Sequence, residues 1–237
     1  MKYCSASVLA LAAALGSAHA EEVSFEYKAV ITETQANGVR QPDVAFSGTK
    51  LTEGYTVTGI ITLDLSLQEY SDGAPGPGPH TVAMYKSGLA ATRATMTVDQ
   101  TGFIFASKPQ PWMAEVRIVN DSYDHLFIET PEYTYPAPPD TIASQGLTFN
   151  LHDDEGTVLN SLSQPTSLSL AGWESATLRY YANPNGDSTV YSAYATLTSL
   201  RPVAAPVPEP ASAAMLSLGL LAVGGAAYRR RRAAPDA

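Results

Sequence analysis

The central part of the chain alternates hydrophobic and polar residues with a period of two. Between Val23 and Ile31 every second side chain is apolar, and Ser24, Glu26 and Lys28 stand between them. Because successive side chains of a strand point to opposite faces of a sheet, this pattern predicts strands with one buried face. The same pattern predicts further strands at 55–65, 81–86, 91–98, 103–106, 114–119, 126–129, 147–152, 167–170, 176–181 and 188–200.

Turn-forming residues separate these runs. Gly, Pro, Asn and Asp gather at 72–79, 131–140, 154–156 and 183–187, where they predict loops and chain reversals, the last of them a hairpin. No window between the two termini shows a helical period of 3.6. We therefore expect an all-β fold over residues 21–201, a single antiparallel β-sandwich with jelly-roll-like connections.

The N-terminus has the three parts of a secretory signal peptide. Lys2 provides the positive charge, residues 8–15 are apolar, and Ala18 and Ala20 flank His19 as the small residues of a cleavage site. The apolar run is too short to span a hydrocarbon core of about 30 Å. We expect residues 1–20 to be removed; an uncleaved anchor is the alternative. Cys4, the one cysteine of the chain, would leave with them, so the mature chain has neither disulfide nor thiolate.

The C-terminus has a different tripartite organisation. A proline-rich spacer at 202–207 is followed by Pro208, Glu209 and Pro210, and then by 17 uncharged residues at 211–227. As a helix these residues would measure about 25 Å, enough for one short membrane crossing. The basic cluster that follows comprises Arg229, Arg230, Arg231 and Arg232, before a tail at 233–237. Basic clusters stay in the cytoplasm, which predicts an inner-membrane intermediate with its β-domain outside.

This order of motif, helix and arginines at 208–232 resembles the PEP-CTERM sorting signal of Gram-negative bacteria. The resemblance implies transient recognition by an exosortase-type membrane protease, followed by release or transfer of the domain to the cell surface. A plain tail anchor, which would leave a periplasmic protein, is the alternative. The body resembles, more loosely, the uncharacterised β-sandwich domains that often precede such tails, on Val57-Thr58-Gly59 and the last strand at 195–200.

Charge narrows the set of partners. Residues 21–207 contain nine Lys and Arg against 21 Asp and Glu, a net charge of −12, whereas the whole chain carries −9. An acidic surface repels phosphate groups, so we expect no nucleic-acid partner and no peripheral binding of the domain to anionic lipid.

Candidate chemistry is sparse. The mature histidines His80, His125 and His152 have no Gly-x-Ser-x-Gly sequence near them, so we expect no enzymatic activity. The densest acidic cluster comprises Asp153, Asp154 and Glu155, whose carboxylates could hold a weak structural calcium ion. The alternative is an ordinary turn. No other cofactor is expected.

Three aromatic residues fall in predicted loops, where their rings could stack on sugars: Trp112, Tyr133 and Tyr135. In the alternative interpretation, these rings close the ends of the sandwich. Our leading hypothesis is a non-enzymatic surface or extracellular-matrix protein that associates with exopolysaccharide. A glycan hydrolase that uses two carboxylates on a β-sandwich is the second hypothesis.

Overall fold

Thirteen β-strands and no helix make up the described part of the chain in a computed structural model. The structure describes residues 22–46, 48–70, 81–86, 92–108, 114–133, 142–184 and 189–203. All of them belong to the first of two units, Met1–Val203; the second is Ala204–Ala237. The predicted signal peptide, the sorting signal and the helix at 211–227 lie outside the described residues. Within those residues, no helix has the length and hydrophobicity to cross a membrane.

The strands are, in chain order, β1 Glu22–Ala36, β2 Val39–Gln41, β3 Asp43–Phe46, β4 Thr49–Thr52, β5 Thr56–Asp64, β6 Val82–Lys86, β7 Arg93–Val98, β8 Phe103–Ala106, β9 Glu115–Asn120, β10 Asp124–Tyr133, β11 Ile142–Asp153, β12 Ser175–Pro184 and β13 Tyr191–Pro202.

Eleven of these strands form one antiparallel sheet, in the order β6-β9-β10-β11-β12-β13-β1-β5-β7-β8 with β2 added beside β1. The remaining two, β3 and β4, form a separate hairpin. The predicted all-β, antiparallel fold is therefore confirmed. Its connections differ from those of a jelly roll, because β9 to β13 follow one another as a meander and one sheet supplies both layers.

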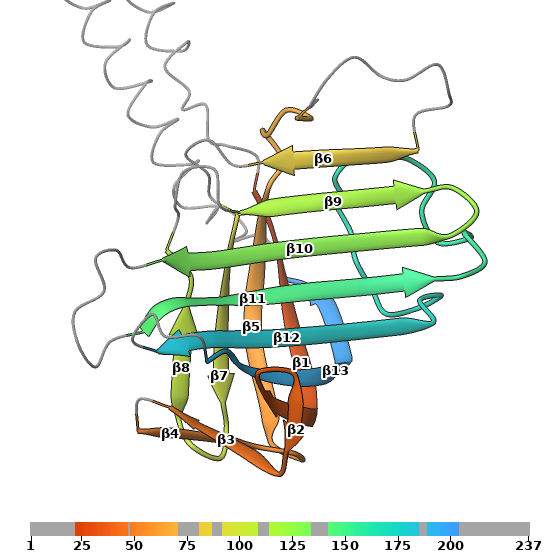
Figure 1. The fold of residues 1–237 in the computed structure, drawn as a ribbon. Helices are drawn as coiled ribbons and strands as arrows, with labels where there is room; N and C mark the ends of the chain where they lie inside the picture. Colours follow the sequence, from red (N-terminus) through yellow and green to blue (C-terminus); the bar gives the residue numbers. More distant parts are fainter. Residues whose placement is uncertain are drawn as a thin grey trace, which may run out of the picture. The chain divides into compact units, whose positions relative to one another are not determined.

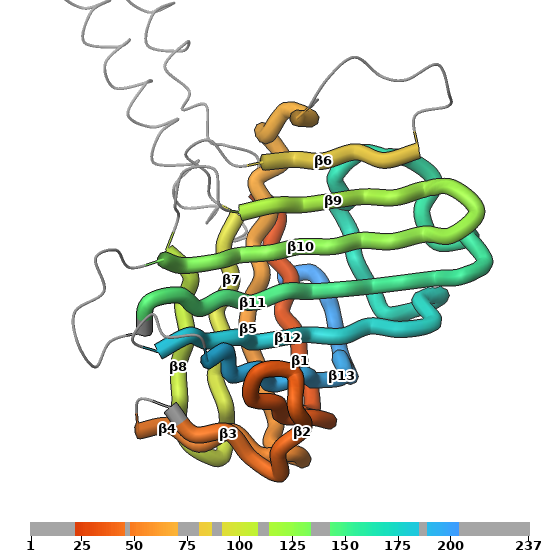
Figure 2. The backbone as a smooth tube through the Cα atoms, viewed as in Figure 1, coloured from red at the N-terminus to blue at the C-terminus, as the bar shows by residue number. Residues whose placement is uncertain are grey.

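The sheet curls so that its two halves face each other. Figure 1 shows β6 and β9–β12 side by side, running across β1, β5, β7 and β8, and the tube in Figure 2 follows the same path. Register shifts between β1 and β13, at Lys28/Ala29 and Ile31/Glu33, lie where one half passes into the other. Such bulges increase bending and twist, which accounts for the curl. The apolar core fills the space between the halves, with Phe25, Phe149 and Tyr180 among its largest buried side chains.

Several boundaries differ from the sequence prediction. Strand β10 continues through Pro131 and Glu132 to Tyr133, so the predicted proline-rich loop does not begin at residue 131. The predicted strand at 167–170 is wrong: this segment belongs to the connection between β11 and β12, and its alternation reflects Leu168 turning into the core. The sequence prediction also missed the three short strands β2, β3 and β4.

The β11–β12 connection at 154–174 is held by a buried carboxylate. Asp124 is fully buried, and its Oδ2 accepts hydrogen bonds from the backbone N–H groups of Val158 at 2.7 Å and Leu159 at 2.6 Å. At the far end of the connection, Trp173 packs against the core. The connection therefore covers this end of the sandwich, and the hydrogen bonds of Asp124 attach it to the start of β10.

Candidate functional site

The outward side chains of β9–β13 form a surface that we call the aromatic face. Along these strands, residues such as Val116, Ile128 and Leu178 turn into the core, and their neighbours in sequence point outward. The strand register then brings the outward residues into rows across the sheet. The aromatic face comprises Glu115, Arg117, Phe127, Glu129, Tyr133, Arg179, Tyr181 and Tyr194, with His125, Asn150 and His152 at one end.

Tyr181 lies across the backbone of β11 because the residue opposite it is a glycine. Gly146 pairs with Tyr181 in the β11–β12 register, and a Cβ at Gly146 would stand 2.6 Å from the Tyr181 hydroxyl. The hydroxyl reaches β10, where it donates a hydrogen bond to Glu129 Oε1 at 3.3 Å. Burial raises the pKa of Tyr181, so this phenol stays protonated and remains a donor. A flat ring thus spans three strands.

Arg179 joins this ring to the next one. Its guanidinium lies 5.5 Å from the ring centroids of both Tyr181 and Tyr194. Its Nη2 and Nε donate to Ser192 Oγ at 3.0 and 3.3 Å. Cation–π contacts on two sides and a hydrogen bond hold the guanidinium, and through it both rings, in fixed positions.

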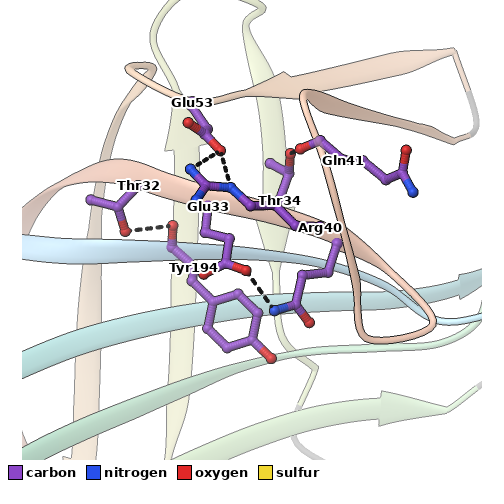
Figure 3. Close-up of polar contacts among 8 residues, drawn as sticks. Thr32, Glu33, Thr34, Arg40, Gln41, Glu53 and Tyr194 are labelled. Carbon is purple, nitrogen blue, oxygen red and sulfur yellow. Dashed lines mark hydrogen bonds and ion pairs between the residues drawn. The ribbon is translucent and has the colours of Figure 1, made fainter.

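The hairpin of β1 and β2 borders the aromatic face beside Tyr194. The turn at Asn37 and Gly38 has positive φ at both residues, 50° and 76°, as a two-residue hairpin turn requires. Glu33 pairs with Tyr194 in the β1–β13 register, and Figure 3 shows the two side by side. The hairpin is tied to the turn after β4 through Arg40, whose Nη2 lies 2.8 Å from Glu53 Oε1 (Figure 3).

Figure 3 also shows how the rest of the hairpin is held. Thr34 Oγ1 donates to the carbonyl oxygen of Gln41 at 2.7 Å. In addition, Gln35 Nε2 donates to Glu33 Oε1 at 2.8 Å. Thr32 Oγ1 donates to the carbonyl oxygen of Tyr194 at 3.4 Å. These contacts fix the edge of the aromatic face against which Tyr194 rests.

Two carboxylates on the aromatic face stand directly opposite each other in different surroundings. Glu115 and Glu129 are paired in the β9–β10 register. Glu115 makes ion pairs with Arg117 at 2.5 Å and Lys86 at 3.7 Å, and the Arg117 guanidinium lies over the Phe127 ring at 5.3 Å. Burial raises the pKa of Glu129, an effect that the hydrogen bond from Tyr181 opposes. Glu129 therefore accepts a proton more readily than an ordinary glutamate does.

Histidines occupy one end of the aromatic face. His125 and His152 are paired in the β10–β11 register, with ring centroids 5.9 Å apart and planes at 76°. His125 Nε2 lies 2.5 Å from Asn150 Oδ1, and His152 Nε2 lies 2.6 Å from Asp154 Oδ1. Burial lowers the pKa of His125, so its ring is neutral at neutral pH.

Of the predicted sugar-contact residues, the structure places one on this face. Tyr133 ends β10 with 48 % of its surface exposed, while Trp112 and Tyr135 lie outside the described residues. The sequence prediction missed Phe127, Tyr181 and Tyr194, because it looked for sugar-contact rings only in and near predicted loops. Their places in the period-two alternation assign them to the outward side, but only the strand register shows that they share one face.

The acidic cluster at 153–155 forms a turn. Asp153 is buried, and its two oxygens accept hydrogen bonds from the backbone N–H groups of Thr157 at 2.8 Å and Glu155 at 3.1 Å. The bonds from Thr157 in particular lower the pKa of Asp153. Asp154 turns instead toward His152. Across the described ranges, no three His, Cys, Asp or Glu side chains are grouped so that they could hold a metal ion.

Comparison with known protein families finds the PEP-CTERM protein-sorting motif at residues 206–232, and the predicted resemblance is confirmed. The motif implies processing by an exosortase-type membrane protein and export to the cell surface through a membrane-anchored intermediate. No curated protein and no solved structure matches the chain. The chain therefore combines a sorting motif of the kind that exosortase substrates carry with a β-domain, whose own outward side chains bear on what it binds.

Proposed function

We propose that the β-domain is a non-enzymatic component of the cell surface or extracellular matrix that binds polysaccharide through the aromatic face. One observation carries this proposal: the Tyr181 ring lies flat over Gly146, fixed by Glu129 on one side and by Arg179 and Tyr194 on the other. Rings held in this way offer apolar surface to a sugar without losing side-chain entropy on binding.

The surroundings of the rings suit a sugar chain. Pyranoses present C–H groups on their faces and hydroxyl groups at their rims, so a binding site combines rings with hydrogen-bonding groups. Here Glu129, Arg179 and Asn150 lie beside the rings, on adjacent strands of one open sheet face. An open face accepts a segment from the middle of a polymer, which a closed pocket does not.

The proposal is tested by binding of the full-length chain, purified in detergent, to a glycan array and to the producing organism's own exopolysaccharide, with and without calcium. We expect Tyr181→Ala to weaken binding at least about tenfold, taking as a guide the roughly 1–3 kcal/mol that a nucleobase stacked on one aromatic side chain contributes. Thr97→Ala, on the opposite layer, is the matched control and should bind normally. Absence of binding to every glycan, or equal binding by the Tyr181 variant, would refute the proposal.

The opposed carboxylates favour a second candidate, a glycan hydrolase. Glu129 with its raised pKa has the character of a general acid, and Glu115, ion-paired with Arg117, stands opposite it as the second carboxylate. Incubation with a glycan that binds, followed by measurement of reducing ends, separates the two functions. Release of reducing ends that disappears in Glu129→Gln supports the hydrolase, and stable binding without release supports the non-enzymatic role.

Sorting has its own experiment. Changing Pro208, Glu209 and Pro210 to alanine should leave the full-length form in the inner membrane, because the exosortase-type protease would no longer recognise it. Fractionation of cells followed by immunoblotting measures this. Unchanged release to the surface would mean that the Pro-Glu-Pro motif does not direct sorting, whereas retention of the wild-type chain as well in the inner membrane would indicate a plain tail anchor.

A further inference from the structure

We propose that His125 and His152 form a two-histidine binding site for a divalent late transition-metal ion, Cu²⁺ or Zn²⁺, at the end of the aromatic face. The two residues occupy directly opposed positions on β10 and β11. The pair lies at one end of the aromatic face, but neither the sorting motif nor the argument for sugar binding, which rests on the Tyr181 ring, uses these two histidines. The inference therefore stands independently of the proposed function.

The separation of the rings fits a single shared ion. With metal–nitrogen bonds of about 2.0–2.1 Å and ring nitrogens about 1.1 Å from the ring centre, two imidazoles on one ion have centroids roughly 4.5–6.5 Å apart for N–metal–N angles between 90° and 180°. The observed centroid separation of 5.9 Å lies inside this range. The backbone therefore already holds the rings at a distance that one ion can bridge.

The hydrogen bonds of the rings also favour metal binding. Each Nε2 faces an oxygen, Asn150 Oδ1 for His125 and Asp154 Oδ1 for His152. If each Nε2–H donates to its oxygen, the lone pair of the neutral ring resides on Nδ1. Histidines that bind metals typically donate their other N–H to a carboxylate or carbonyl oxygen, which fixes the tautomer and makes the ligand more basic.

The protonation state required of the histidine rings and the solvent exposure of the site also favour metal binding. A metal ligand must be a neutral imidazole, the form in which an ordinary histidine is mostly present at neutral pH. Asp154 is mostly exposed, with 70 % of its side chain accessible, and Tyr123 flanks the His152 ring at 5.5 Å. The site is therefore open to solvent, and water would complete the coordination of the ion.

The chemistry of the ligands selects the ion. Imidazole suits Cu²⁺, Ni²⁺ and Zn²⁺, of which Cu²⁺ binds most tightly, whereas calcium requires oxygen ligands. This site therefore differs from the calcium site that the acidic cluster at 153–155 suggested. Asp154 is not a ligand of the ion in this site. It affects the ion only indirectly, through its hydrogen bond with His152.

The test is Cu²⁺ binding to the full-length chain, purified in detergent and loaded with one equivalent of CuCl₂. Pulsed electron paramagnetic resonance counts the imidazoles bound to the ion, and titration calorimetry with CuCl₂ and with ZnCl₂ gives the affinity. We expect two imidazoles in the wild-type chain. In His125→Ala and in His152→Ala we expect one imidazole or none, with affinity reduced at least about tenfold.

Two further variants sharpen the result. Asp154→Asn should retain two imidazoles but bind about tenfold more weakly, because the amide is a poorer acceptor for the His152 N–H. Thr97→Ala, on the opposite layer, is the control and should equal the wild type. Fewer than two imidazoles in the wild-type spectrum, or unchanged affinity when both His125 and His152 are replaced, would overturn the proposal. The wild-type spectrum decides even if a variant misfolds.

Discussion

The two outer faces of the β-domain are made of the same antiparallel strands but carry different side chains. The aromatic face presents rings, arginines and opposed carboxylates. On the other half of the sheet, the outward residues form what we call the threonine face: Ser24, Glu26, Lys28, Thr58, Ile60, Thr95, Thr97 and Ile104. It contains an open hollow of about 500 Å³ lined by Thr58, Thr97 and the ion pair of Glu26 with Arg201.

This difference distinguishes side chains that merely suit an exposed strand from side chains that a ligand could bind. Threonine is common on solvated strands because its branched side chain suits a pleated surface. The rings of Tyr181 and Tyr194 are not needed for that purpose, and yet they are fixed by Arg179 on the outside of the sheet. Both halves also contain one glycine against which a tyrosine packs, Gly59 with Tyr27 and Gly146 with Tyr181. Substituting each glycine therefore tests directly whether the two halves of the sheet differ in their roles.

The largest effect is expected from Gly59→Ala. The added Cβ would overlap the carbonyl oxygen of Thr95 and stand 2.6 Å from the hydroxyl of the buried Tyr27, which donates to that same carbonyl at 2.7 Å. Because the backbone must move, we expect a loss of about 3 kcal/mol or more in the free energy of unfolding. Chemical denaturation of the full-length chain measures it. A loss no larger than that of Gly146→Ala would contradict this account.

A slightly smaller loss is expected from Asp124→Ala. Removing the carboxylate leaves the backbone N–H groups of Val158 and Leu159 without their acceptor. Each unsatisfied buried donor costs about 1–3 kcal/mol, so we expect a total of roughly 2–4 kcal/mol in unfolding free energy. Glycan binding by the molecules that remain folded should be unchanged, because the aromatic face is not altered. Reduced affinity at full folding would show that the connection at 154–174 takes part in binding.

The predictability of these regions from sequence differs for physical reasons. Alternation is a local signal, so it indicated most strands, and the Asn37-Gly38 pair was a hairpin signal that would also have placed β2. Alternation alone cannot show that Leu168 reaches the core from a loop. The aromatic face depends on register: Tyr181, Gly146 and Glu129 come from three strands, and no short-range pattern in one strand specifies its partner.

On the aromatic face, Gly146→Ala should affect binding more than folding. A Cβ 2.6 Å from the Tyr181 hydroxyl forces the ring away, and its hydrogen bond to Glu129 is lost. Because a surface ring can swing outward, we expect a loss of only about 1–2 kcal/mol in unfolding free energy. The affinity for a bound glycan should fall about tenfold, as for Tyr181→Ala. Normal glycan affinity in Gly146→Ala would show that the flat ring is not the contact surface.

The pH dependence of stability gives a smaller, signed effect. Burial raises the pKa of Glu129 above its ordinary value of 4.5, so in that range the folded chain retains a proton that the unfolded chain releases. This contribution to stability is present at low pH and is lost as the pH rises through the folded-state pKa. Glu129→Gln should remove it, so the stability of the variant relative to the wild type should increase from about pH 4.5 upward. Denaturation of both chains across this range measures the difference, and a constant difference would contradict the burial argument.

The smallest effect is expected on the threonine face, and its measurement shows which of the two faces binds glycan. Thr97→Ala removes an outward hydroxyl and leaves the core untouched, so we expect a change within about 0.5 kcal/mol in unfolding free energy and no change in glycan affinity. The hollow beside Thr97 nevertheless has charged and hydroxyl groups that a sugar could contact. If Thr97→Ala or Lys28→Ala lowered glycan affinity while Tyr181→Ala did not, the binding surface would be the hollow. The fixed rings on the other half would then serve only to cover Gly146 and support the sheet.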